Sequence, residues 1–331
     1  MKPLVCLLAA SLAFAAGPPA YKITGKIKIG GAGRWDYVFV DSANHRLYVS
    51  HGTQTEVIDT SSDKLIATIL ETNGVHGIAI AADLGKGFIS DGQDNDVTVF
   101  DTKTNQRTSR IKTGANPDSI IYEPVTHRVF TFNGRSKDST IIDARSGNVV
   151  TASLPLDGKP EFSQVDGKGH VFANIEDKNE IVVIDAKDGV VTKRYSIAPC
   201  DSPSGLTIDP KGRLYSVCDN KTMIVSDPAA GKVLATPAIG ARPDGVAFDD
   251  GYAFSANGGD GNLTMVGEKG GTFDVIATIP TQAGARTIGA DQKAHKLYLP
   301  VADFAPGEAK DGKKGRPQPV ADTFSIIVVG R

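Results

Sequence analysis

The sequence lacks the short motifs that identify common enzyme classes. It contains no G-x-S-x-G, no H-E-x-x-H, no P-loop and no dinucleotide-binding glycine pattern. No C-x-x-C-H occurs either, which argues against covalently attached haem. The formal net charge is only −2, so no overall field favours nucleic acid or an anionic membrane. Function therefore has to be inferred from the arrangement of the residues.

Long apolar stretches are also scarce. The one such run covers residues 4–16 and is shorter than the about 20 residues that a membrane-spanning helix needs. It follows Lys2 and contains Ala13-Phe14-Ala15, a pattern typical of a cleavage site. We expect a secretory signal peptide over residues 1–15, with a linker to about residue 20, and a periplasmic or secreted mature protein. The alternative is a buried first helix.

No segment after the apolar run shows the 3.6-residue period of a helix. Instead, two strand-like patterns recur at a spacing of roughly 40 residues. One pattern ends in an aspartate, at Asp59, Asp101, Asp143, Asp185 and Asp227. The other has an aromatic or apolar centre, at Tyr48, Phe88, Phe130, Phe172, Tyr215, Phe254 and Tyr298. The seven aromatic-centred copies predict seven structural repeats.

Each repeat has room for four short strands separated by turns. In the first they are expected at 37–40, 46–50, 56–59 and 65–70. Four strands in about 40 residues is typical of a β-propeller blade, whose apolar faces are covered by neighbouring blades. The predicted fold is therefore an all-β, seven-bladed propeller over residues 21–331. The last repeat lacks a fourth strand, and residues 21–29 are expected to supply it by pairing with 325–329, which closes the ring.

The repeats resemble the YVTN-type repeat of YncE-like propellers. The segments that carry the resemblance are Arg46-Leu47-Tyr48-Val49-Ser50 with Thr55-Glu56-Val57-Ile58-Asp59-Thr60, and Asp96-Val97-Thr98-Val99-Phe100-Asp101-Thr102. The resemblance covers essentially the whole mature chain and implies the fold. It does not imply one chemistry, since related propellers include binding proteins, surface-layer proteins, electron-transfer domains and lactonases.

Two sets of polar residues recur at one expected rim of the central channel. The first set lies just before the innermost strand: Asp36, His76, Asp118, Glu161, Ser204, Asp244 and Arg286. The second set follows the second strand: His51, Asp91, Asn133, Cys218, Asn257 and Asp303. The first and second strands form an antiparallel hairpin, so both sets are expected at the channel mouth. They form either a ligand or metal site or only a solvated rim.

Histidine with carboxylates suits a divalent metal, and His51, His76 and Asp36 are the candidate ligands. The other four histidines, His45, His127, His170 and His295, are expected as exposed turn residues at the opposite rim. Cys200 and Cys218 remain after cleavage and are expected to form a disulfide in an oxidising compartment, the alternative being two free thiols.

An insertion at about 305–320 in the last repeat contains several basic residues and three prolines. It is expected to be a mobile surface loop, or alternatively a flap over the mouth or a basic contact for a phosphate-bearing partner.

Three functions remain open. The favoured one is an exported binding protein with a small molecule or protein at the mouth, which would not be an enzyme. The second is a metal-assisted hydrolase of lactones or esters, in which a carboxylate takes a proton from a metal-bound water. The third is nucleic-acid binding, which the acidic mouth disfavours.

Overall fold

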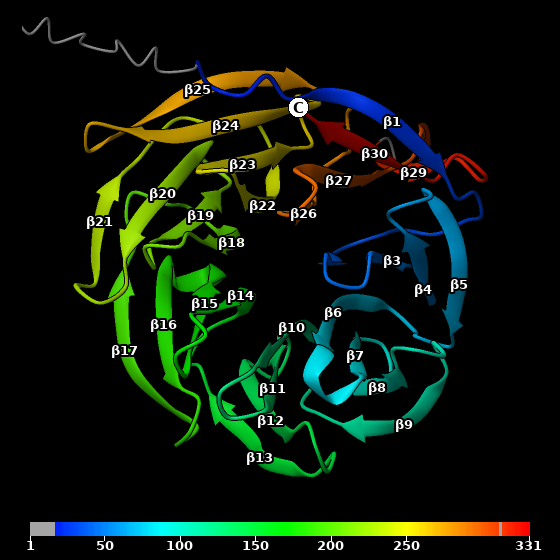
Figure 1. Ribbon diagram of the computed structural model, residues 1–331, viewed down its shortest axis with the longest axis vertical. Helices are drawn as coiled ribbons and strands as arrows, with labels where there is room; N and C mark the ends of the chain where they lie inside the picture. Colours follow the sequence, from blue (N-terminus) through cyan, green and yellow to red (C-terminus); the bar gives the residue numbers. More distant parts are fainter. Residues whose placement is uncertain (1–16, 311–312) are drawn as a thin grey trace, which may run out of the picture.

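Thirty short strands surround a central axis in the computed structural model, which describes residues 17–310 and 313–331 (Figure 1). The strands form seven four-stranded antiparallel sheets and one separate hairpin. The predicted signal peptide, residues 1–15, lies outside the described residues. The seven sheets confirm the predicted all-β, seven-bladed propeller.

Six blades are continuous in sequence, each with its first strand nearest the axis. The first is β2 (Val38–Asp41), β3 (Arg46–His51), β4 (Gln54–Asp59) and β5 (Lys64–Leu70). The second is β6 (Val75–Ala81), β7 (Lys86–Asp91), β8 (Asp96–Asp101) and β9 (Arg107–Lys112). The third is β10 (Pro117–Glu123), β11 (Arg128–Asn133), β12 (Asp138–Asp143) and β13 (Val149–Pro155).

The next three blades repeat this order. The fourth is β14 (Pro160–Val165), β15 (His170–Ile175), β16 (Glu180–Asp185) and β17 (Val190–Ser196). The fifth is β18 (Pro203–Ile208), β19 (Leu214–Cys218), β20 (Thr222–Asp227) and β21 (Lys232–Ala235). The sixth is β22 (Pro243–Asp249), β23 (Tyr252–Asn257), β24 (Asn262–Lys269) and β25 (Thr272–Pro280).

The seventh blade joins the two ends of the chain. Its inner strands are β26 (Gly289–Asp291), β27 (Lys296–Val301) and β30 (Ser325–Gly330), and β1 (Lys22–Lys28) is the outermost. β1 runs antiparallel to β30, from the pair Lys22 and Gly330 to the pair Lys28 and Ser325. The predicted closure of the ring by the N-terminal strand is confirmed.

Burial follows the position of each strand in its blade. The second and third strands are buried on both faces, because neighbouring blades cover them, whereas the fourth strands are half exposed. The apolar clusters span adjacent blades: one joins Ile27 of β1 and Phe324 to Leu47 and Val49 of β3. The core therefore lies between blades rather than at the axis, and this leaves the axis free for a channel.

The inserted stretch in the last blade is not the irregular loop that the sequence favoured. It forms a two-stranded antiparallel hairpin of β28 (Phe304–Lys310) and β29 (Lys313–Pro319). At its base, the Phe304 ring lies 5.8 Å from the Trp35 ring, and Arg34 donates to the Pro317 carbonyl at 3.2 Å. These contacts attach the hairpin beside the segment that leads to Asp36.

Three of the four other histidines lie in turns at the opposite rim, as predicted, whereas His170 is the first residue of β15, and two of the four are not fully exposed. His127 and His295 are half-buried, and their Nδ1 atoms lie 3.0 Å from Asp83 and 3.1 Å from Asp249. Pairing alone does not set the exposure, because His170 lies 2.8 Å from Asp166 and is exposed. Helical structure in the described residues is limited to the 3-10 turns η1 (Ala82–Leu84) and η2 (Glu176–Lys178). Among these residues, no helix has the length and apolar character needed to cross a membrane.

Candidate ligand site at the channel mouth

The seven innermost strands run in the same direction along the axis, so their first residues lie at one rim of the channel. The first residue set of the sequence analysis occupies this rim. Asp36 precedes β2 by two residues, His76 and Asp118 are the second residues of β6 and β10, and Arg286 lies just before β26. The structure brings these side chains from separate blades into contact.

Asp36, His76 and Asp118 form the tightest group. His76 Nδ1 lies 2.7 Å from Asp36 Oδ2 and 3.6 Å from Asp118 Oδ1. One donor atom from each residue lies within 4.8 Å of the other two, so the group could hold a metal ion. Burial alone would lower the pKa of His76, but Asp36 and Asp118 outweigh it and raise that pKa to about 9.

Arg286 completes the rim on the other side of Asp36. Its guanidinium lies 2.9 Å from Asp244 Oδ2 and 3.9 Å from Asp36 Oδ1, and it donates to the Trp35 carbonyl at 2.9 Å. Burial opposes the charged form, but Asp244 and Asp36 raise the pKa of Arg286 above its ordinary value. Arg286 is therefore a fixed cation shared by two acids.

Glu161 and Lys159 occupy the rim opposite Asp36. Lys159 Nζ lies 2.6 Å from Glu161 Oε1 and also contacts Glu176. The Tyr37 hydroxyl donates to Glu161 Oε2 at 3.4 Å. Tyr37 and Glu161 belong to the first and fourth blades, so this contact crosses the channel.

The carboxyl groups of the mouth are crowded and partly desolvated, and both effects oppose their ionisation. Burial raises the pKa of Asp118 to about 6, opposed by His76 and reinforced by Asp36. Burial raises the pKa of Asp244 to about 7, although Arg286 opposes the shift. Burial and Asp118 hold the pKa of Glu161 well above its ordinary range, despite Lys159. The mouth is therefore a partly desolvated acidic site, which favours a positively charged occupant.

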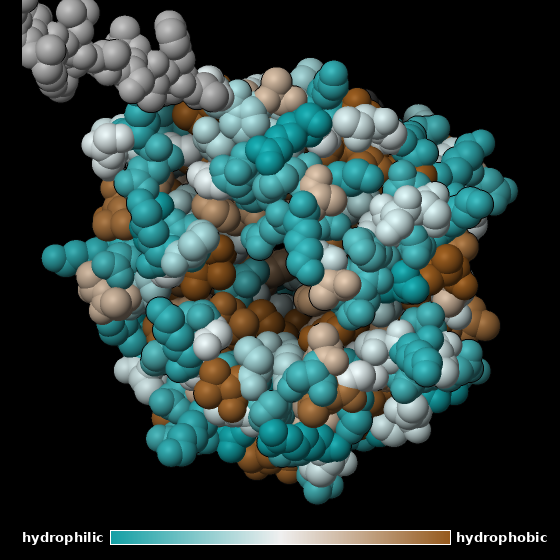
Figure 2. Space-filling view, in the orientation of Figure 1, coloured by the Kyte–Doolittle hydropathy of each residue, from teal (hydrophilic) through white to brown (hydrophobic). Residues whose placement is uncertain are grey.

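Two aromatic side chains close the channel beneath the mouth. The Tyr37 and Phe162 rings meet edge to face across the axis, with centroids 4.8 Å apart. Below them lies a cavity of about 750 Å³, lined mainly by apolar residues of all seven inner strands and extending to Asp83, Pro124 and Gln292 at the opposite rim. Figure 2 shows a hollow at the centre of one face of the molecule, with hydrophobic side chains gathered around it. Tyr37 and Phe162 thus lie between the charged residues of the mouth and the apolar cavity.

The second residue set lies at the same rim, but most of its side chains do not enter the mouth. Asp91, Asn133 and Asn257 are fully buried within their blades. Each bonds to a threonine of the third strand: Thr98 donates to Asp91 at 2.6 Å, and the amides of Asn133 and Asn257 contact Thr140 at 3.1 Å and Thr264 at 2.8 Å. Their expected role in the mouth is wrong, because these polar groups join the second strand to the third.

The structure places His51 and Asp303 outside the group formed by Asp36, His76 and Asp118. His51 Nδ1 lies 3.0 Å from Glu56 Oε1, and its ring stacks on Phe324 at 4.1 Å. It is buried between the first and last blades and is not part of the group formed by Asp36, His76 and Asp118. Asp303 is exposed and accepts a hydrogen bond from Gln282.

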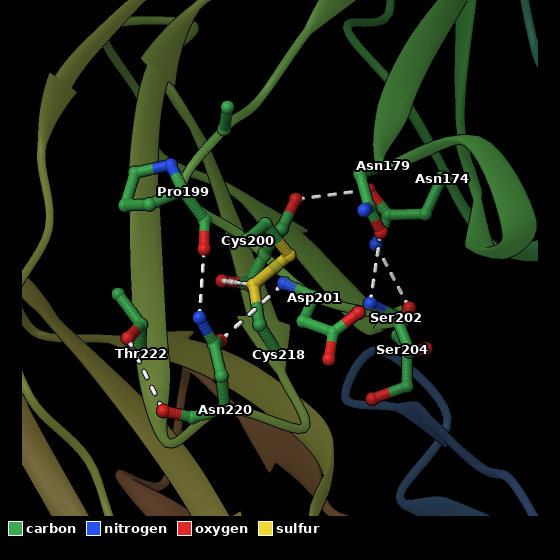
Figure 3. Close-up of a disulfide and its surroundings, with 12 residues drawn as sticks. Asn174, Asn179, Pro199, Cys200, Asp201, Ser202, Ser204, Cys218, Asn220 and Thr222 are labelled. Carbon is green, nitrogen blue, oxygen red and sulfur yellow. Dashed lines mark hydrogen bonds between the residues drawn. A yellow bond between two sulfur atoms is a disulfide. The ribbon is translucent and has the colours of Figure 1, made fainter.

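The fifth blade places a disulfide where other blades have these polar residues. Cys200 and Cys218 are bonded, with Cα atoms 5.5 Å apart (Figure 3). Nearby, Ser204 donates from Oγ to the Pro243 carbonyl at 3.3 Å, so it supports the rim without adding charge. Asn174 Nδ2 donates to the Ser204 carbonyl at 2.8 Å, a contact visible in the same view. Covalent and polar contacts thus fix this side of the mouth.

Four residues of the mouth were not found by sequence reasoning: Tyr37, Lys159, Glu176 and Asp219. Asp219 adds to the acidity, since burial and then Glu176 raise its pKa. Glu176 and Asp219 follow the second strands of their blades directly, where the second, third and sixth blades have Gly92, Gly134 and Gly258. When the repeats are aligned, a charged residue at a position where other repeats have glycine stands out, and this pattern could have identified both.

Comparisons with known proteins agree on the fold. The model of the YNCE-like beta-propeller family matches residues 66–299, more than half of the chain. No curated protein matches. A chain of hydrazine synthase from Kuenenia stuttgartiensis is similar, with a TM-score of 0.71 and 16% identity over 82% of this chain and 94% of that one.

Two other solved structures are similar over nearly the full length of the protein. A chain in the structure of U3-55K has a TM-score of 0.74 and 8% identity over 92% of this chain and 97% of that one. A chain of the mitotic checkpoint complex has a TM-score of 0.77 and 12% identity over 100% of this chain and 99% of that one. At these identities the likeness concerns the fold alone.

Proposed function

The chain belongs to the YNCE-like β-propeller family, and from this premise we propose that it is an exported binding protein that takes a positively charged ligand at its channel mouth. The single observation that carries the proposal is the convergence of acidic side chains there. Six carboxyl-bearing residues face two fixed cations and one histidine: Asp36, Asp118, Glu161, Glu176, Asp219 and Asp244 against Lys159, Arg286 and His76.

The shape of the mouth supports a small ligand rather than a threaded chain. Tyr37 and Phe162 form a floor directly below Asp36 and Glu161. A cationic group resting on this floor would have carboxylates on several sides and the Tyr37–Phe162 pair beneath it. Aromatic rings attract cations through their negative faces, so both features favour the same charge.

Export is a part of the proposal that rests on separate support. A disulfide such as Cys200–Cys218 persists in oxidising compartments and is rare in the cytosol of most organisms. The apolar run at the N-terminus has the composition of a secretory signal peptide. Cell fractionation of the tagged full-length chain checks this part independently of the ligand.

The ligand proposal is tested by calorimetry with a panel of organic amines, guanidines and size-matched carboxylates, all in the presence of EDTA. We expect binding among the cations only. Glu161→Gln and Asp244→Asn should each weaken it by roughly 10- to 100-fold, since hydrogen bonds to charged groups contribute about 1.5–3 kcal/mol. Asp274→Asn, on the exposed outer strand β25, is the matched control and should bind normally.

Two outcomes would contradict the proposal. One is binding of the carboxylates but not of the amines. The other is an equal effect of the mouth variants and Asp274→Asn.

A metal-assisted hydrolase is the second candidate, favoured by the proximity of Asp36, His76 and Asp118. In such a reaction water adds to the carbonyl carbon of a lactone or ester, the C–O bond breaks, and the leaving oxygen takes up a proton. Turnover of simple lactones that depends on added Zn²⁺ or Mn²⁺ and is lost in Asp118→Asn would favour this candidate over pure binding.

A further inference from the structure

The three acid and imidazole groups on one side of the mouth have the composition of a metal site. Asp36, His76 and Asp118 come from three consecutive blades at the same repeat position, so the rigid ring of blades sets their spacing. We propose that Asp36, His76 and Asp118 bind one divalent transition-metal ion, which is itself a positively charged occupant of the mouth. This inference rests on the proposed function, because the ion would occupy one side of the same site.

The mutual distances fit ligands of one ion. Donor atoms that bind a common ion at about 2.0–2.2 Å lie roughly 3 Å apart. His76 Nδ1 is 2.7 Å from Asp36 Oδ2 and 3.6 Å from Asp118 Oδ1. Side-chain movements of a fraction of an ångström would bring the three donor atoms to similar distances from a shared ion, with no movement of the strands.

An independent observation comes from Asp118. This residue is only 9% exposed, yet its Oδ1 atom has no hydrogen-bond partner among the described residues. A buried carboxylate oxygen without a partner is costly, and native structures nearly always satisfy such an atom. Oδ1 is the atom turned towards His76 Nδ1, so an ion held there would satisfy it.

The orientation of His76 is fixed by the backbone behind it. A Cβ atom added to Gly92 would lie 2.7 Å from His76 Nε2, so Gly92 packs directly against that edge of the ring. The Nδ1 edge therefore faces Asp36 and Asp118. Glycine at position 92 makes room for the imidazole in the orientation that a metal ligand requires.

The donor set indicates which ions fit. One imidazole nitrogen with two carboxylates suits Zn²⁺, Mn²⁺ or Fe²⁺, whereas Ca²⁺ and Mg²⁺ prefer oxygen ligands alone. Three protein ligands leave further coordination positions, as catalytic and ligand-binding metal sites do.

Titration calorimetry on EDTA-treated, full-length protein with ZnCl₂ and MnCl₂ tests the inference. We expect one ion per chain, with CaCl₂ and MgCl₂ binding at least 10-fold more weakly. His76→Gln and Asp118→Asn should each weaken Zn²⁺ and Mn²⁺ binding at least 100-fold. Asp274→Asn, on the exposed outer strand β25, and His170→Gln, an exposed histidine, are controls that should stay within about threefold of the parent protein. Circular dichroism of each variant shows whether it is folded.

Absence of stoichiometric binding to the parent protein would overturn the inference, as would full binding by folded His76→Gln or Asp118→Asn. Should either variant fail to fold, Gly92→Ala provides the second test. It keeps all three ligand residues but displaces the His76 ring, and it should weaken metal binding at least 10-fold. Binding of organic cations in EDTA, lost in Asp244→Asn, would show that the proposed function stands even where the metal does not bind.

Discussion

At the scale of single residues, the most informative buried group outside the mouth is Asp91. It is fully buried at the end of β7, and Thr98 donates to its Oδ2. Burial raises the pKa of Asp91 to about 8; the Thr98 hydroxyl opposes the shift and the neighbouring Asp96 reinforces it. Asp91 is therefore protonated in the folded state at neutral pH. Asn133 and Asn257 occupy the equivalent position in other blades, which shows that a neutral amide fits there.

We predict that Asp91→Asn changes how stability depends on pH. Between about pH 4 and pH 8 the folded protein holds the Asp91 proton and the unfolded chain does not. This group therefore lowers the free energy of unfolding by up to about 1.4 kcal/mol per pH unit as the pH rises. The substituted amide cannot ionise, so the variant should gain on the order of 2 kcal/mol relative to the parent protein between pH 5 and pH 7, measured by urea unfolding. A constant difference across this range would contradict the prediction.

The two residue sets show what a single sequence can predict. The repeat period placed Asp36, His76 and Asp118 correctly at one rim, because equivalent positions in equivalent strands share a rim. The period could not tell which way a side chain at that rim points. The side chains of the second set face their own third strands, where a threonine recurs at the same offset, at Thr98, Thr140 and Thr264. That matched threonine is visible in the sequence and would have separated the two sets.

At the scale of secondary-structure elements, β1 holds the ring closed. Ile27 of β1 is 6% exposed and belongs to the apolar cluster that joins the seventh blade to the first. Ile27→Ala should lower the free energy of unfolding by about 2–5 kcal/mol, as buried isoleucine truncations do. Lys28→Ala, exposed on the same strand, should have little effect. Thermal or chemical unfolding measures both, and similar effects of the two variants would mean that β1 contributes little to closure.

The disulfide is a second element-scale contribution to stability. It joins residues 18 apart in sequence, at the start and end of the first hairpin of the fifth blade. A loop of this size is expected to stabilise the fold by about 3 kcal/mol, mainly by restricting the unfolded chain. The double variant Cys200→Ser with Cys218→Ser should lose about this amount in oxidising conditions. Under a reducing agent the variant and the parent protein should unfold alike, and a persistent difference would contradict the disulfide as the cause.

Strands were predictable and the hairpin of β28 and β29 was not. The strands of the blades have alternating or continuous apolar residues, so their period is visible in the sequence. The inserted stretch contains three prolines and no apolar alternation, which favoured a loop. Its base is instead fixed by distant contacts of Phe304 with Trp35 and of Pro317 with Arg34, which no local pattern reveals.

At the scale of the whole molecule, the fold depends on the repeated apolar pattern of the blades, whereas the site depends on individual side chains. Burial between blades requires only seven similar sheets, so residues at many positions can vary and the fold remains. The mouth depends on individual side chains from separate blades, and a fold by itself does not set function.

The acidic mouth leads us to expect no specific binding of nucleic acid. Phosphate groups would meet Asp36, Asp118 and Glu161 without enough cations to compensate. Double-stranded DNA should bind no tighter than about 10⁻⁶ M at physiological salt, the range of non-specific association. Fluorescence anisotropy across a salt series checks this. Tighter binding with a steep loss of affinity at higher salt would favour a nucleic-acid partner and argue against a cationic ligand.

The most direct test of the acidic mouth as a cation site is an anomalous-scattering measurement on crystals of the full-length protein soaked in MnCl₂. We predict one strong anomalous peak at the channel mouth, about 2 Å from Asp36, His76 and Asp118, and no comparable peak at His51 or at the four turn histidines. A crystal structure in which these three side chains point away from one another, or a soaked crystal with no peak between them, would contradict it.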